Sequence, residues 1–501
     1  MIEELSPPPD PVRCCEQLDG LPYRIFLDSA AKGPLGRYSF LAADPIAVVR
    51  SKGARTERLD RLDGPAVSGD GGRYALPRVV SGDALDAVHA LLAPHAVDPE
   101  PGLPPFQGGA AGYVAYDWGR VLERLPSPRY DDLGMPDVVL GLYDWVLAWD
   151  HEASKAWLIS TGLPETSPVE RDRWAAARAA EVRARLTSPP SDAGGVDRSG
   201  PRSDGSTTRA AGAPCYPVEG GWWNRELALR SSFTHAAYLD VVARVREYIF
   251  AGDIFQANLS QRFEAPLDEP PWALYRRLRT RNAAPFAAYL DFPEGVVVGA
   301  SPERFLRVDA GGHVETRPIK GTRPRGVGPE HDAALGQALT ESAKDRAENL
   351  MIVDLLRNDL SRVCAPGTVH VPELFALERY ATVYHLVSTV VGDLAPGASV
   401  LDLLRASFPG GSITGAPKVR AMEIIAELEP SERGVYCGAV AYWSVTGPLD
   451  SCIAIRTAVA VGGRVYFSAG GGIVADSDPE QEYRETLDKA RGMIDALQAR
   501  E

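Results

Sequence analysis

The sequence predicts an α+β fold, because strand-like and helix-like segments both occur but do not alternate as regular βαβ units. Three runs rich in apolar, aromatic and β-branched residues have the pattern of strands, at 23–27, 38–41 and 138–143. Three segments have helical patterns, at 170–186, 235–251 and from Pro417 onward. The first is rich in Ala and Arg, which are good helix formers, and Thr234 can cap the second.

Length and composition predict two regions. The chain has 501 residues, more than the roughly 100–200 residues of a typical domain. Residues 187–221 are rich in Ser, Thr, Gly, Pro and Arg and lack any strand or helix period, which predicts a flexible linker. We therefore expect an N-terminal α+β region at 1–186 that packs on a second region at 222–501. The second region holds nearly all the candidate sites, so we expect the chemistry there.

Charge and cysteine content exclude several protein classes. Lys and Arg total 53 and Asp and Glu total 67, which gives a net charge of −14 and argues against nucleic-acid partners. No run approaches the roughly 20 apolar residues of a membrane span, and the acidic, Pro-rich N-terminus is not a signal peptide. The six cysteines form no CxxC pair and suit reduced thiols. We expect a cytoplasmic enzyme that binds neither nucleic acid nor a membrane.

Three successive glycines, Gly470, Gly471 and Gly472, follow a strand-like run at 465–467. Their backbone N–H groups have no side chains around them, which suits a carboxylate or phosphate ligand. A tight turn is the alternative, and the segment taken alone favours it.

Two acidic pairs have helical spacing. Asp345 and Glu348 are three residues apart, and so are Glu482 and Glu485. On a helix each pair shares one face, so the carboxylates could hold a hard divalent cation, and Lys489 could meet the anion bound to it. A solvated helix face with salt bridges is the alternative for each pair alone.

Two further residues could react directly. Lys320 lies in a Pro/Gly-rich loop and could act as a nucleophile if its pKa is lowered. Glu303 follows an apolar strand at 296–298, where burial would raise its pKa and suit it to act as an acid. The alternatives are a surface lysine and a surface Glu–Arg pair.

Five motifs together resemble the family of chorismate-utilising enzymes. They are DIFQANLSQ at 253–261, PIKGT at 318–322, GGSITGAPK at 410–418, the glycines at 470–472 and EYRET at 482–486. The resemblance is strong from about 234 to 497 and weaker at RYSFL (37–41) and GGAAGY (108–113). It implies a large composite fold, a two-layered β-sandwich with helices on the outside.

The resemblance also implies a metal site. Glu348 and Glu485 match the family's Mg²⁺ ligands, with Asp345 and Glu482 beside them. The ion would bridge to the ring carboxylate of the substrate.

Further residues match substrate-binding and catalytic positions of the family. Arg456 and Tyr442 match residues that hold the enolpyruvyl carboxylate, and Glu303 matches the acid that protonates the departing hydroxyl. The remaining matches are backbone donors at Gly470, Gly471 and Gly472, a cationic contact at Lys489, and active-site positions at His385 and Thr414.

Two positions discriminate within the family. Relatives that add water to chorismate have a lysine base where this chain has Gln256, which cannot deprotonate water, so ammonia is the expected nucleophile. Anthranilate synthases normally have Ala where this chain has Lys320, which resembles the aminodeoxychorismate synthases. The resemblance then implies that Lys320 attacks ring carbon two and that ammonia enters at carbon four. Neutral Lys320 is required, and we expect Mg²⁺ and Arg456 to lower its pKa.

The resemblance implies a partner subunit as well. No Gly-x-Cys-x-Gly motif with a downstream His-x-Glu is present, so a separate glutamine amidotransferase is expected to supply ammonia. Residues 26–29 occupy the place of a Leu-Leu-Glu-Ser element that binds tryptophan in anthranilate synthases, but Asp28 replaces the Glu. A bound tryptophan is compatible with this departure.

Other activities stay open at this point. One is a chorismate aminase that attacks carbon two, giving anthranilate or aminodeoxyisochorismate. Another is a catalytically silent subunit that binds chorismate or tryptophan. Our expected product would supply p-aminobenzoate, either for folate or for a secondary metabolite such as an antibiotic.

Overall fold

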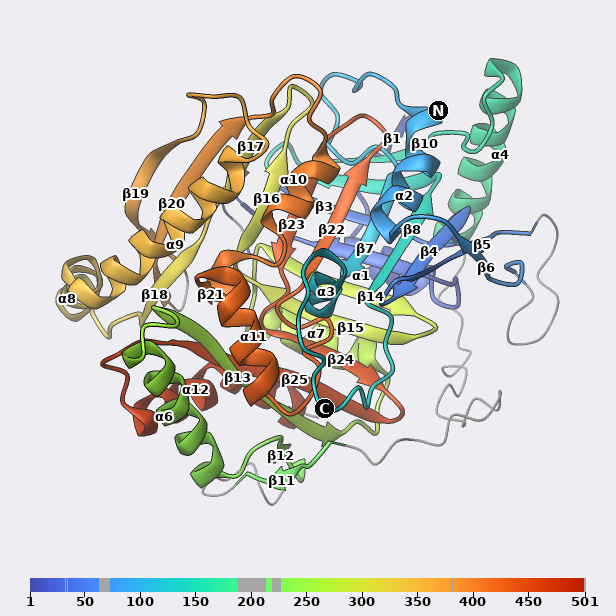
Figure 1. Ribbon diagram of the computed structural model, residues 1–501. Helices are drawn as coiled ribbons and strands as arrows, with labels where there is room; N and C mark the ends of the chain where they lie inside the picture. Colours follow the sequence, from blue (N-terminus) through green and yellow to red (C-terminus); the bar gives the residue numbers. More distant parts are fainter. Residues whose placement is uncertain are drawn as a thin grey trace.

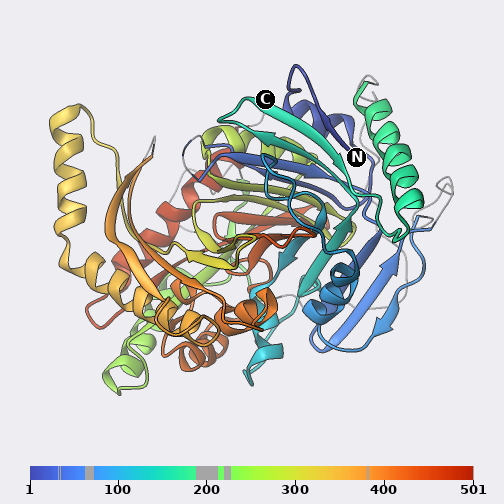
Figure 2. The same cartoon turned by 90° about the horizontal axis from the view of Figure 1, so that it is seen from above.

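Two large antiparallel sheets form the centre of the protein, with helices outside them (Figures 1 and 2). The computed structural model describes residues 1–31, 33, 35–62, 73–187, 213–218, 227–380 and 383–499. The predicted α+β sandwich with external helices is therefore confirmed.

Sheet I contains 13 strands within the described residues and combines both halves of the chain. Its strands, in spatial order, are β1 (Ile2–Glu4), β10 (Lys155–Ser160), β9 (Trp145–Asp150), β3 (Tyr38–Ala42), β2 (Arg24–Asp28), β14 (Phe286–Phe292), β15 (Gly295–Ser301), β24 (Thr457–Val461), β25 (Arg464–Ile473), β13 (Gln256–Pro266), β12 (Arg230–Ser231) and β11 (Tyr216–Pro217), with β21 (Gly415–Ala416) also paired to β13.

Sheet II contains 12 strands in the same described ranges and is also composite. Its strands, in spatial order, are β18 (Ile319–Pro324), β20 (Val383–Asp393), β17 (His313–Thr316), β16 (Arg304–Val308), β23 (Leu449–Ile453), β22 (Ala439–Ser444), β7 (Gly109–Val114), β8 (Val138–Tyr143), β4 (Ala47–Lys52), β5 (Arg55–Asp60) and β6 (Arg78–Val80), with β19 (His370–Arg379) paired to β20.

The helices surround these sheets, with α8 and α9 on one side and α4 on the opposite side in both views (Figures 1 and 2). They are α1 (Pro11–Gln17), α2 (Ala84–Leu92), α3 (Gly119–Leu122), α4 (Pro168–Thr187), α6 (His235–Phe250), α7 (Pro271–Arg281), α8 (Pro329–Glu341), α9 (Ala343–Ser361), α10 (Val400–Ser407), α11 (Lys418–Leu428) and α12 (Pro479–Gln498), with short 3₁₀ turns η1 (Ala93–His95), η2 (Tyr116–Trp118) and η3 (Gly411–Ile413). Within the described ranges, none of them is long and apolar enough to cross a membrane.

Successive residues of the strands face two different cores. Ile25 of β2 packs in the core between the sheets, whereas its neighbour Phe26 packs in the core under α1, α7 and α12. This alternation follows from the two-residue period of a strand. A third core lies on the other side of sheet II, where Ile352 of α9 and Leu404 of α10 pack against it.

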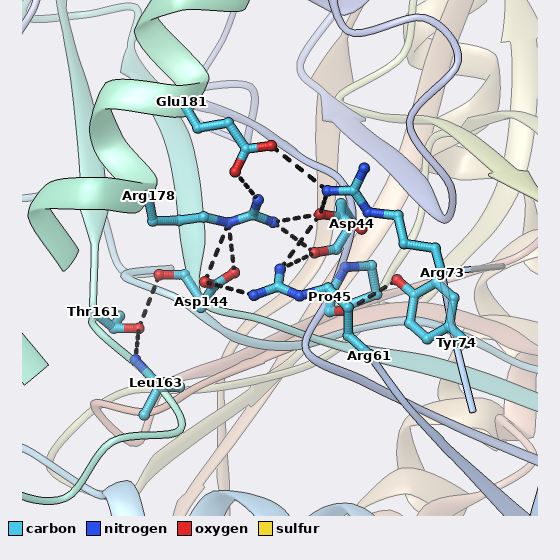
Figure 3. A network of polar contacts seen from close by, with 10 residues as sticks. All are labelled: Asp44, Pro45, Arg61, Arg73, Tyr74, Asp144, Thr161, Leu163, Arg178 and Glu181. Atoms are coloured by element: carbon cyan, nitrogen blue, oxygen red, sulfur yellow. Dashed lines mark hydrogen bonds and ion pairs between the residues drawn. The ribbon is translucent and has the colours of Figure 1, made fainter. Parts of the chain in front are cut away.

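Helix α4 is attached to the sheets by a buried network of charged residues (Figure 3). Arg178 lies 2.9 Å from the Asp44 carboxylate and 3.2 Å from the Asp144 carboxylate. Arg73 lies 2.6 Å from Asp44. The Asp44 and Asp144 side chains are 0% and 1% exposed, so they depend on these cations for partners.

The predicted boundary at 187–221 stays a prediction. Most of that segment, 188–212 and 219–221, lies outside the described residues. Inside it, Tyr216–Pro217 forms β11, which pairs with β12, although the sequence there has no strand period. Strands from before 187 and after 227 share both sheets, because β2 pairs with β14 and β7 pairs with β22.

Candidate active site

Glu303 and Arg456 lie where the chain crosses between the two sheets. Glu303 follows β15 of sheet I and precedes β16 of sheet II, and Arg456 lies on the crossing from β23 to β24. β15 pairs with β24 and β16 pairs with β23, so the two crossings are neighbours. The Arg456 carbonyl accepts a hydrogen bond from the Ala300 N–H at 3.0 Å, and Arg456 has a left-handed backbone with φ 49°.

Glu303 has the environment of a general acid. It is 5% exposed, and burial raises its pKa to about 7. A hydrogen bond from the Ser412 side chain, the charge of Lys320, the Ile319 backbone N–H and Arg456 oppose this rise. Burial and the raised pKa agree with the sequence-based expectation, and near neutral pH the group can both hold and release a proton.

Lys320 lies in strand β18 rather than in the predicted loop. β18 pairs with β20, and one extra residue of β18 is accommodated between Ile319 and Thr322. Such a bulge redirects side chains, and Gly321 within it has φ 86°. The Lys320 Nζ donates a hydrogen bond to the Ser412 carbonyl at 3.0 Å.

Burial lowers the pKa of Lys320, and the charge of Lys489 lowers it further. Glu348, Glu303 and Glu485 act in the opposite direction. The main cause is thus removal from water, rather than the Arg456 charge that the sequence suggests. A lysine with a lowered pKa has a larger share of neutral, nucleophilic amine.

His385 lies on β20 directly opposite Thr322 of β18. Its Nδ1 is 2.9 Å from the Thr322 hydroxyl. Burial lowers the pKa of His385 to about 3, and the charge of Arg456 adds to the effect. The imidazole is therefore neutral at physiological pH and acts there as a hydrogen-bonding group.

The three glycines lie inside strand β25, not in a turn. β13 pairs with β25 along Arg464–Ile473, whereas β24 pairs only with Arg464–Phe467. Among the described residues, 468–473 therefore have no strand partner on their second edge, and the Gly470 carbonyl accepts a hydrogen bond from Lys489 instead of from a strand. A side chain at Gly470 would collide with the Leu259 carbonyl, and one at Gly472 would come within 2.5 Å of the Gln256 amide.

Gln256 is 0% exposed, and both its amide oxygen and its amide nitrogen lack a hydrogen-bond partner among the described residues. Because such groups are costly to bury unpaired, they mark a position where a ligand could bind. Thr414 differs, since its hydroxyl donates to the Gly410 carbonyl at 3.0 Å and stays within its own loop.

The predicted acidic pairs lie on helices α9 and α12, with lysines between them. Lys344 lies 4.0 Å from both Glu348 and Glu482, and the Lys489 Nζ lies 2.6 Å from Glu485. Lys489 also donates to the Gly470 carbonyl at 2.8 Å, which joins α12 to β25.

The two pairs have different electrostatic environments. Burial raises the pKa of Glu348 and of Glu482, whereas Lys489 is the main cause of a lowered pKa at Glu485. Asp345 forms an ion pair with Arg323 at 2.8 Å. Within the described ranges no three His, Cys, Asp or Glu side chains form a complete metal-binding group.

Tyr442 lies on β22, the neighbour of β23 in sheet II. It packs against Phe40 and Phe106 and lines a cavity of about 300 Å³. Asp28 and Ser29 line the same cavity. The Asp28 carboxylate accepts hydrogen bonds from the Tyr275 hydroxyl and from Arg279 of α7, neither of which lines the cavity.

Three polar residues of the site do not emerge from the sequence. Ser412 contacts both Lys320 and Glu303, Lys344 lies between two carboxylates, and Thr322 faces His385. Thr322 lies in the PIKGT motif, Ser412 lies in the GGSITGAPK motif, and Lys344 precedes Asp345. For Lys344, the spacing of four residues from Glu348 is a usable signal.

Comparisons with known proteins agree on one family. A family model described as chorismate binding enzyme matches residues 25–495. Aminodeoxychorismate synthase component 1 of Salmonella typhimurium is 41% identical over 486 residues, 95% of this chain and 94% of that protein. Anthranilate synthase component 1 of Thermus thermophilus is 41% identical over 482 residues, 96% of this chain and 93% of that protein.

A solved structure agrees as well. Anthranilate synthase component I from Streptococcus pneumoniae superposes with a TM-score of 0.72 at 31% identity, covering 92% of this chain and 93% of that one. The range 25–495 matched by the family model includes Glu303, Lys320, Glu348 and Glu485. This chain is an enzyme of the chorismate-binding family.

Proposed function

We propose that this enzyme aminates chorismate at carbon four and releases 4-amino-4-deoxychorismate, a precursor of p-aminobenzoate. The observation that carries the proposal is the pairing of Lys320, whose pKa is lowered, with Glu303, whose pKa is raised to about 7. The Salmonella relative, named as an aminodeoxychorismate synthase component, supports the same activity.

The proposed chemistry has two substitutions. The Lys320 amine bonds to ring carbon two, the ring double bonds shift, and the hydroxyl at carbon four leaves as water with a proton from Glu303. Ammonia then bonds to carbon four, the double bonds shift back, and the bond from carbon two to Lys320 breaks. A proton released by the reacting amines returns Glu303 to its acid form, so chorismate and ammonia give the product and water.

We propose Glu348 and Glu485 as Mg²⁺ ligands, with Asp345 and Glu482 nearby. Mg²⁺ commonly takes one or two carboxylates and completes its shell with water and substrate, so a pair of oxygen donors on two helices fits it. When bound, the ion would supply positive charge to the ring carboxylate of chorismate.

We propose that Arg456, Lys489 and the free edge of β25 hold the substrate carboxylates. His385 would donate or accept a hydrogen bond as a neutral imidazole. Gln256 would accept a hydrogen bond from ammonia rather than deprotonate water. Tyr442 lines the cavity beside Asp28 and Ser29, and we propose a role for it there.

We propose two partners besides chorismate. The component names of the relatives support a second subunit, a glutamine amidotransferase that donates ammonia. The cavity of about 300 Å³ beside Tyr442 is large enough for a small ligand, and tryptophan is the ligand we propose for it.

The product of the ammonia reaction tests the proposal. The pure protein is incubated near pH 7 with chorismate, Mg²⁺ and enough ammonium to supply free ammonia, and the product is identified by mass spectrometry. We expect 4-amino-4-deoxychorismate, and no product after Mg²⁺ is removed by a chelator. Anthranilate fluorescence without an added lyase would overturn the assignment, as would aminodeoxyisochorismate. No turnover even with an amidotransferase would indicate a silent subunit.

A further inference from the structure

Ser412 connects the two reacting side chains. It lies in turn η3 and is 7% exposed. Its carbonyl accepts a hydrogen bond from the Lys320 Nζ at 3.0 Å, and its side chain lies near Glu303, where it opposes the rise of that carboxyl's pKa. One residue thus contacts both the amine and the acid that the proposed reaction requires.

The loop that carries Ser412 is fixed from several sides. At its C-terminal end, the Lys418 Nζ donates to Asp359 at 2.6 Å and to the Ser407 carbonyl at 2.9 Å. Arg433 donates to the Ile413 carbonyl at 3.0 Å, next to Ser412 itself. These contacts tie the loop to α9, α10 and the segment after α11, so Ser412 has little freedom to move.

A serine hydroxyl suits both protonation states of Glu303. It donates a hydrogen bond to the carboxylate and can accept one from the carboxylic acid. The Ser412 carbonyl likewise accepts an N–H from either the ammonium or the neutral amine of Lys320. The contacts can therefore persist while a proton leaves one group and reaches the other.

We propose that Ser412 is a positioning residue that holds Glu303 and Lys320 at a fixed separation, its hydroxyl on the acid and its carbonyl on the nucleophile. The proposal rests on the proposed function, because both groups must act on one substrate. It assigns a specific role to the serine of the GGSITGAPK motif.

The pH dependence of kcat distinguishes this role from a purely structural one, because loss of a structural contact alone would not change the pKa of Glu303. Glu303 faces the Ser412 hydroxyl, the Ile319 N–H and the charges of Lys320 and Arg456, and the Cys437 thiol is a further titratable group close by. Ser412→Ala removes only the hydroxyl that stabilises the carboxylate. The pKa of Glu303 then rises further, and the alkaline limb of kcat moves to higher pH.

The test compares Ser412→Ala with Ser407→Ala. Ser407 is also buried, at 0% exposure, but its hydroxyl has no hydrogen-bond partner among the described residues, so it is a matched control. Chorismate consumption with ammonia and Mg²⁺ is followed across pH. We expect Ser412→Ala to lower kcat at least tenfold, to leave KM within twofold of wild type and to move the alkaline limb of kcat to higher pH. Ser412→Thr, which keeps a hydroxyl, should return the alkaline limb to its wild-type position. Ser407→Ala should match wild type.

Two outcomes overturn the proposal. One is a Ser412→Ala profile that superposes on wild type, and the other is a lower kcat with an unmoved limb. If Ser412→Ala does not fold, Ser412→Cys replaces it, because a thiol is a weaker hydrogen-bond donor than a hydroxyl. The alkaline limb of kcat should then move by an intermediate amount. An unmoved alkaline limb in Ser412→Cys would also overturn the proposal. The limb is read from chorismate consumption, whichever product forms, whereas product identity in wild type tests the proposed function.

Discussion

Glu303 and Lys320 must each adopt the protonation state opposite to the one that they would have in water. The reaction needs a protonated carboxyl and a neutral amine, which are the minor forms of an exposed Glu and an exposed Lys at neutral pH. Burial moves both in the required direction, because it disfavours each charged form. The same low-polarity environment therefore prepares the acid and the nucleophile together.

A bell-shaped pH profile follows from these two groups. The rate should fall as pH rises through about 7, because Glu303 loses its proton, and it should fall at lower pH as Lys320 becomes protonated. The measurement is kcat/KM against pH at a constant concentration of free ammonia. Glu303→Gln should lose about 10²–10⁴-fold in rate, and its residual activity should lack the alkaline limb. An alkaline limb of unchanged position in Glu303→Gln would exclude Glu303 as the acid.

At the scale of elements, buried ion pairs decide how α4 is attached. Removing Arg178 leaves the buried Asp44 with fewer cations, and it leaves Asp144, among the described residues, with only the more distant Arg61, 3.9 Å away. Breaking such a pair typically costs about 3–5 kcal/mol. Arg178→Met, which keeps an apolar side chain of similar length, should lower the free energy of urea unfolding by about that amount.

Arg173→Met on the same helix is the control for this prediction. Arg173 and its partner Glu170 have side chains that are 74% and 46% exposed, and exposed pairs contribute about 0–1 kcal/mol. Equal losses in the two variants would mean that the network in Figure 3 does not stabilise the fold beyond ordinary surface pairs.

At the scale of the whole molecule, the site forms where the chain crosses from one composite sheet to the other. Glu303 and Arg456 lie on adjacent crossings between the sheets, and Lys320 comes from the edge of sheet II. The carboxylates come from α9 and α12, which lie on different sheets. Residues far apart in the sequence thus meet because the N- and C-terminal parts build both sheets together.

The sequence predicts some of this arrangement and misses other parts for physical reasons. The spacing of Glu482 and Glu485 predicts a helix face correctly, because the period of a helix is local. The strand character of Lys320 and of Gly470 is missed, because Gly and Pro in a short segment resemble a turn. Only long-range pairing, with β20 and β13, makes these segments strands. The cavity beside Tyr442 is not predicted for the same reason, since it is built from distant strands.

The most direct test of the central claim is the mass of the Lys320 peptide. Wild-type enzyme is mixed with chorismate and Mg²⁺ without ammonia, quenched, digested and analysed by mass spectrometry. We expect this peptide to gain the mass of chorismate less one water, and the adduct to disappear when ammonia is added. Lys320→Ala should form no adduct and should lose amination by orders of magnitude while it still binds chorismate. Near-normal amination by Lys320→Ala would contradict the account and indicate direct attack by ammonia.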